Sequence, residues 1–171
     1  MGSGFFTYLQ ELEMMAFFSG YPLVYLLVRV AAGNRMIKNK SNVKYLSLLP
    51  FAYALVGTLY LGLLLRNLHP DYSFQHIQLK IPQRFLAIWG LMSILFWIPP
   101  IARRTILSIL HSLVFFALLL RDLFFQLTGM VSDKTIVQND MKIYSVSLLL
   151  NLVAIILVSL ISLLFGFRRK H

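Results

Sequence analysis

The stretch from Phe85 to Leu120 most constrains how this chain can fold, because it holds two apolar runs separated by a short break. The break contains Pro99-Pro100 followed by Arg103-Arg104. In one straight membrane helix both arginines would lie near the bilayer centre, where each costs about 2.5–3.5 kcal/mol on insertion scales. The stretch therefore predicts a helical hairpin in a membrane, with its turn at the break.

The remainder of the chain has the same apolar character. Its 171 residues are 58% hydrophobic and 13% charged, whereas soluble domains carry about 25% charged residues. Long apolar runs bounded by basic clusters are typical of spanning helices. We therefore predict an all-α, polytopic helical membrane protein of about five transmembrane helices. A single transmembrane domain would occupy residues 1–171, with spans at about 14–32, 45–65, 82–98, 101–120 and 143–167.

Two parts of this topology leave alternatives open. The short third run could be a re-entrant segment, which would give four spans and break the charge pattern at the C-terminus. Leu123-Phe124-Phe125 could continue the fourth helix beyond the membrane boundary or lie at the interface, before Gly129 ends the segment.

The distribution of basic residues predicts the orientation, with the N-terminus outside and the C-terminus inside. Ten basic residues fall on the inner side: Arg29, Arg35, Lys38, Lys40, Lys44, Arg103, Arg104, Arg168, Arg169 and Lys170. Six fall on the outer side: Arg66, Lys80, Arg84, Arg121, Lys134 and Lys142. We expect the inner residues in loops and at the C-terminus to meet anionic lipid headgroups, so membrane lipids are predicted partners.

Composition argues against several classes of function. The chain has no cysteine, which excludes disulfides, thiolate metal sites and cysteine nucleophiles. Its net charge of +10 does not indicate a nucleic-acid partner, because the basic residues flank apolar runs and leave no basic surface in water. We predict no cofactor.

His111 is the one histidine expected at mid-membrane depth. A bis-histidine haem would need a second histidine at that depth, and the sequence offers none. We expect His111 to bond to a neighbouring helix, with Ser93, Thr58 or Asn151 as partner. A functional role stays open, because ionisable groups inside a membrane often have one.

A weak candidate metal site lies in the predicted outer loop, where His69 and Asp71 stand close to His76. Imidazole and carboxylate groups are possible ligands. The spacing matches no closed zinc motif, however, so a solvated loop is the favoured interpretation.

Two stripes predict helix-packing faces. Small residues recur every four positions in the second span, a pattern that lets another backbone approach closely. A polar stripe follows one side of the fifth span, and in lipid such groups bond across helix interfaces. The first stripe is Ala54, Thr58 and Gly62, and the second is Ser147, Asn151 and Ser162.

No catalytic residues are predicted, since the spans hold no Asp or Glu at mid-membrane depth. We expect a small integral subunit that packs against other membrane proteins to assemble, stabilise or regulate a larger complex in a bacterial-type inner membrane. Two alternatives remain. One is a small permease or lipid-handling transporter using His111 and Asn151, and the other is a membrane enzyme acting on lipid headgroups near Arg103-Arg104.

Overall fold

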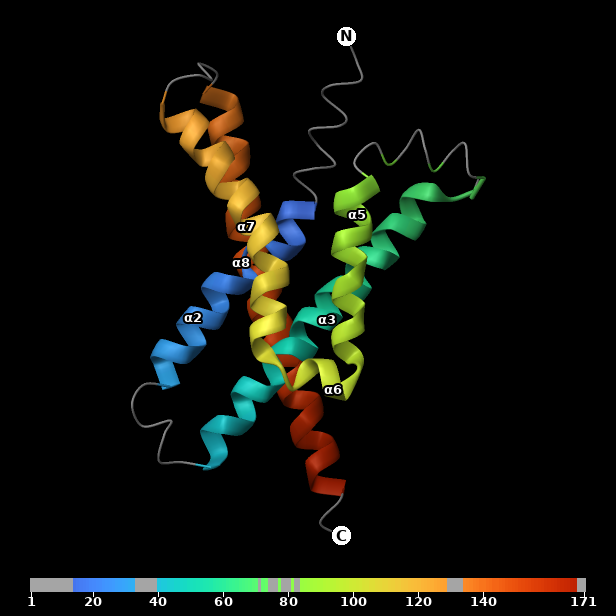
Figure 1. Cartoon of the computed structure of the whole chain (residues 1–171), viewed down its shortest axis with the longest axis vertical. Helices are drawn as coiled ribbons and strands as arrows, with labels where there is room; N and C mark the ends of the chain where they lie inside the picture. The colour runs from blue at the N-terminus through green and yellow to red at the C-terminus, as the bar shows by residue number, and fades with distance from the viewer. Residues whose placement is uncertain are drawn as a thin grey trace.

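The computed structural model describes residues 14–32, 40–70, 72–73, 77, 81, 84–128 and 134–168 (Figure 1). Every regular element in these ranges is helical. A helical turn over residues 14–18 comes first. It is followed by α2 (Tyr21–Ala32), α3 (Lys40–Leu68), α5 (Arg84–Leu91), the 3₁₀ helix η2 (Met92–Trp97), α6 (Pro99–Ala102), α7 (Thr105–Leu127) and α8 (Lys134–Arg168).

Among the described residues, three helical stretches are long and apolar enough to cross a membrane: Leu46–Leu68, Thr105–Phe125 and Tyr144–Leu164. The predicted first and third spans are shorter apolar stretches, Met14–Val30 and Arg84–Trp97, below the roughly 20 residues of a straight crossing. The first is interrupted at Ser19-Gly20, and the third tightens into a 3₁₀ helix before Pro99. The all-helical class and its membrane-compatible character are confirmed.

Several helix ends differ from the predicted span ends. Leu123-Phe124-Phe125 belongs to α7, so these residues continue the predicted fourth helix. The helix that contains the predicted fifth span begins earlier than the apolar run at residue 143, because α8 starts at Lys134. Charged residues mark where an apolar run stops, but they do not prevent the backbone from remaining helical.

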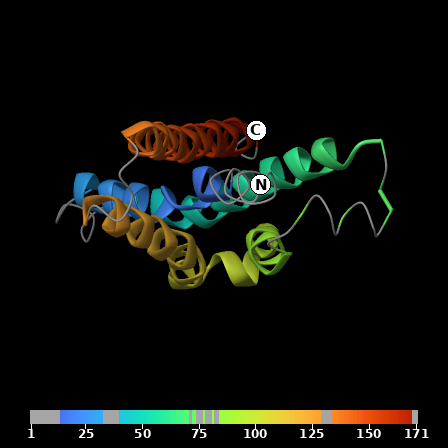
Figure 2. The same cartoon turned by 90° about the horizontal axis from the view of Figure 1, so that it is seen from above.

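The helices form three layers, seen most clearly from above (Figure 2). The middle layer contains α2 and α3, with α8 on one side and the hairpin of α5, η2, α6 and α7 on the other. Helix α3 contacts both outer layers, packing on η2 and on α8. This position explains why 44% of its apolar window is buried, compared with 22% for α8.

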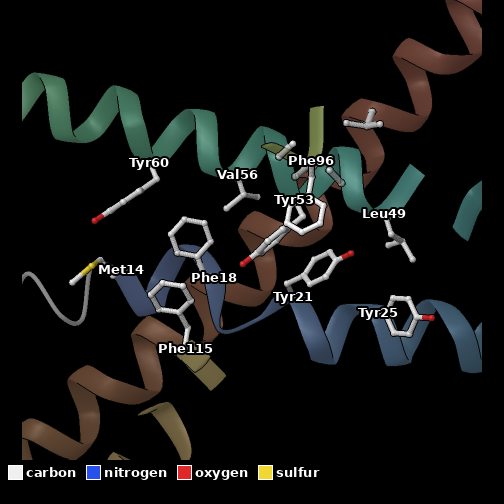
Figure 3. Close-up of a cluster of buried hydrophobic side chains, with 14 of the residues drawn as sticks. Met14, Phe18, Tyr21, Tyr25, Leu49, Tyr53, Val56, Tyr60, Phe96 and Phe115 are labelled. Atoms are coloured by element: carbon white, nitrogen blue, oxygen red, sulfur yellow. The ribbon is translucent and has the colours of Figure 1, made fainter. Parts of the chain in front are cut away.

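An aromatic cluster fills the centre of the bundle (Figure 3). Phe18 stacks on Phe115 of α7 with ring centroids 4.8 Å apart, and Tyr21 of α2 lies 4.4 Å from Tyr53 of α3. Phe96 of η2 meets Tyr53 edge to face. Rings from all these elements therefore meet at one point, where aromatic pairs gain energy beyond their buried area.

Candidate functional site

A polar contact inside the bundle is formed where the first helical segment breaks. Residues 14–18 are helical, Ser19 and Gly20 form a turn, and α2 resumes at Tyr21 with Pro22 in its first turn. Proline has no backbone N–H to donate, so the carbonyl four residues before it, that of Phe18, loses its usual helical partner. Other backbone groups at the break form hydrogen bonds outside their own helix.

Helix α8 supplies these bonds. The Gly20 N–H donates to Ser147 Oγ at 2.8 Å, and Asn151 Nδ2 donates to the Phe17 carbonyl at 2.9 Å. Ser147 Oγ also lies 3.3 Å from the Met15 carbonyl, to which it donates. Ser147 and Asn151 are both buried, and we call this set of bonds the α8 cap.

Close approach of the two backbones makes the α8 cap possible. A Cβ at Gly20 would lie 2.8 Å from the backbone and the hydroxyl of Ser147. A side chain at this position would therefore push α8 away from the break. Ser162, the third residue of the predicted polar stripe, is half-buried and makes no hydrogen bond with any described residue.

His111 sits at a second polar contact, between α7, α3 and α5. Its Nδ1 lies 2.7 Å from Tyr53 Oη, and its Nε2 lies 2.8 Å from the Trp89 carbonyl. Because a carbonyl only accepts, Nε2 carries a proton, and in the neutral ring Tyr53 donates to Nδ1. Both ring nitrogens are thus paired inside the chain.

Trp89 and His111 each donate a hydrogen bond to the backbone carbonyl of the other. The Trp89 ring lies 4.9 Å from the His111 ring, with 5° between their planes, and Trp89 Nε1 donates to the His111 carbonyl at 3.1 Å. We call the arrangement of Tyr53, Trp89 and His111 the His111 clamp. The expected bond to a neighbouring helix is present, but the expected partners Ser93, Thr58 and Asn151 all bond elsewhere.

Sequence reasoning missed the tyrosines and serines that accompany this clamp. The buried face of α7 carries Ser108, Ser112 and Phe115 beside His111. Tyr21 Oη lies 2.8 Å from Ser108 Oγ, which joins α2 to α7. The spacing of these residues at three and four positions marks one helix face, and this was the signal available in the sequence.

The predicted small-residue stripe on α3 is divided by the fold. Ala54 is buried, whereas Thr58 and Gly62 are exposed. Thr58 Oγ1 accepts from Trp97 Nε1 at 3.0 Å, and a Cβ at Gly62 would meet no atom within 4 Å. The close contact of α3 occurs at Gly57 instead, where a Cβ would overlap Ser93 of η2.

The other predicted site residues are only partly described. His69 is exposed, with its ring edge-on to Tyr72, while Asp71 and His76 lie outside the described residues, so the weak metal site stays a prediction. Among the headgroup residues, Arg103 and Arg104 are exposed in the turn before α7. The side chains that fall outside the described part are those of Arg35, Lys38, Lys40, Lys44, Arg168, Arg169 and Lys170.

One cavity of about 320 Å³ lies between the two arms of the hairpin. Its walls are apolar side chains of η2, α6 and α7, together with Trp89 and His111 of the His111 clamp. His111 and Trp89 are the residues in this lining with polar side-chain groups, and their ring nitrogens are already paired.

No protein-family model, curated protein or solved structure matches this chain. The buried polar contacts of this structure, at the α8 cap, at the His111 clamp and between Tyr21 and Ser108, link helices to one another. The outer surface of the bundle has an open face on α3 and an apolar cavity. Arg103 and Arg104 lie in the chain between two residues that line this cavity.

Proposed function

We propose that this protein is a small integral membrane subunit that packs against partner membrane proteins and helps assemble, stabilise or regulate a larger complex. The proposal includes about five membrane passes, with the N-terminus outside and the C-terminus in the cytoplasm of a bacterial-type cell. In support, the end of α2, the start of α3, α6 and the end of α8 lie toward the same end of the molecule (Figure 1). The predicted cytoplasmic basic clusters adjoin these ends.

The observation that carries the proposal is the open face on the second half of α3. Thr58 and Gly62 are exposed there beside Leu59 and Leu65, each 47% exposed. The empty space at Gly62 would let another helix approach the α3 backbone closely. Within this chain no described helix uses that space, so a partner helix is the occupant we propose.

Transport receives less support from the same geometry. A permease would need polar groups free to handle a solute, yet both ring nitrogens of His111 and the side-chain NH₂ group of Asn151 are hydrogen-bonded to other parts of the chain. Buried polar groups paired in this way hold helices together. This pairing favours a packing role for both residues.

Replacing Gly62 with leucine tests the proposal. We expect the variant to fold, because nothing lies within 4 Å of the added Cβ, and to lose its partners because the side chain blocks close approach. The measurement is co-purification of native partners from membranes solubilised in mild detergent, with circular dichroism reporting the fold. Ala117→Leu, at an exposed small residue of α7, is the matched control.

The control variant should retain the wild-type set of partners. A Gly62→Leu protein that co-purifies the same partners as wild type would contradict the proposed face. A wild-type protein that remains a monomer in mild detergent and has an activity of its own would overturn the subunit proposal altogether.

A further inference from the structure

The cavity in the hairpin exists because the two arms do not close on each other. The one-turn helix α6 separates η2 from α7, and its first two residues are Pro99 and Pro100. Leu95 of η2 and Leu107 of α7 consequently line opposite walls of a space of about 320 Å³. This volume lies within the range of about 300–1,000 Å³ that is typical of small-ligand sites.

The chemistry of the walls selects an apolar occupant. The lining consists of hydrophobic side chains except at the His111 clamp. There, both imidazole nitrogens are already bonded, and the Trp89 N–H is donated to a backbone carbonyl. A polar solute would have to give up its bonds to water without finding replacements. A hydrocarbon chain would lose no hydrogen bonds on entering the cavity.

The cavity opens on the outer surface of the bundle. Met92 and Leu95 are 42% and 44% exposed, and Leu110 on the facing wall is 55% exposed. In a membrane these residues meet lipid tails. The hydrocarbon most abundant at such an opening is a phospholipid acyl chain.

Positive charge lies at the turn end of the same cavity. Arg103 and Arg104 are exposed between Ile101 and Leu107, which both line the cavity. Neither arginine forms an ion pair with any residue in the described part of the chain. Arginine binds phosphate oxygens well, because its planar group donates several hydrogen bonds at once.

We propose that this cavity holds one acyl chain of an anionic phospholipid whose phosphate is bound by Arg103 and Arg104. The apolar walls account for the chain, and the unpaired arginines account for the headgroup. The inference is independent of the partner proposed for α3, because it concerns the space between η2 and α7 and a lipid rather than a protein.

Tryptophan fluorescence tests this site directly. The sequence has two tryptophans, so Trp97→Phe leaves Trp89, in the cavity lining, as the sole emitter. The full-length variant in dodecyl maltoside micelles is titrated with phosphatidylglycerol carrying a dibrominated acyl chain, since bromine quenches tryptophan on contact. Phosphatidylcholine with the same brominated chain is the comparison lipid.

We expect saturable quenching at lower concentrations of the brominated phosphatidylglycerol than of the phosphatidylcholine. Adding Arg103→Gln and Arg104→Gln should raise the half-quenching concentration of phosphatidylglycerol roughly five- to thirty-fold, because each arginine near a lipid surface contributes a factor of about five. Arg66→Gln, at the far end of α3, should leave it unchanged.

A cavity-filling variant separates the site from general lipid contact. Leu107→Phe should reduce quenching by both lipids, because the larger ring occupies the space of the chain. Equal quenching by the two lipids, an Arg66→Gln effect as large as that of the arginine pair, or quenching unaffected by Leu107→Phe would each overturn the proposal.

Discussion

Replacing Ser147 with alanine should destabilise the protein, because it removes the hydroxyl at the centre of the α8 cap. Ser147 Oγ accepts the Gly20 N–H at 2.8 Å and lies 3.3 Å from the Met15 carbonyl. A methyl group of alanine cannot replace either bond. Because Ser147 is 1% exposed, neither water nor a lipid headgroup reaches the site to compensate.

The size of the effect follows from the Gly20 N–H, which is left unpaired, because the Met15 carbonyl still accepts from the Ser19 N–H. Removing the partner of a buried backbone donor costs about 1–3 kcal/mol. Hydrogen bonds between membrane helices contribute about 0.6 kcal/mol on average and about 1.7 at most. We therefore expect Ser147→Ala to lower the free energy of unfolding by about 1–2 kcal/mol.

The assay is reversible unfolding in mixed micelles with rising sodium dodecyl sulfate, followed by circular dichroism. Ser162→Ala is the matched control, because this half-buried serine lies on the same helix and makes no hydrogen bond with a described residue. Its effect should stay within about 0.5 kcal/mol. Equal stabilities of the two variants would refute the role of the α8 cap in holding the break.

Two further substitutions probe the other contacts by the same unfolding assay. Tyr53→Phe removes the partner of His111 Nδ1 and should lower the free energy of unfolding by about 1 kcal/mol. The control Tyr72→Phe, at an exposed tyrosine, should not change it measurably. A Tyr53→Phe protein as stable as wild type would contradict a stabilising role of the His111 clamp. Gly90→Ala would place a Cβ 2.8 Å from the buried Phe18 ring and should destabilise by about 1–3 kcal/mol. Its control is Gly62→Ala, where the space is open, and equal stability of these two alanine variants would show that the tight packing at Gly90 has no energetic weight.

Much of the fold was accessible from hydropathy alone. The runs that become α3, α7 and α8 were each predicted as spans, because a long apolar run in a charge-poor chain has few alternatives to a membrane helix. The short first and third runs were less accessible. Their length depends on where Ser19-Gly20 and Pro99 interrupt the helix, and on whether another helix satisfies the freed backbone groups.

The candidate sites were predicted less well than the fold. Residues Ser147 and Asn151 were singled out by their polar spacing, but nothing in that spacing indicated that they bond to the break before α2. His111 was singled out by its depth, yet its partner Tyr53 lies 58 positions away in the chain. Hydrogen-bond partners between helices depend on how the helices rotate and cross, and periodicity within one helix does not contain that information.

Hydropathy and charge were enough to predict the helical, membrane-compatible class of this protein, because long apolar runs with basic ends satisfy their backbone polar groups in lipid as helices. Which small residues pack inside the chain depends instead on how the helices meet. Gly57 and Gly62 lie on the same helix and have the same chemistry, but Gly57 faces Ser93 whereas Gly62 faces open space. The layered packing of α3 makes that difference, since a glycine acquires a role only from the neighbour that approaches it.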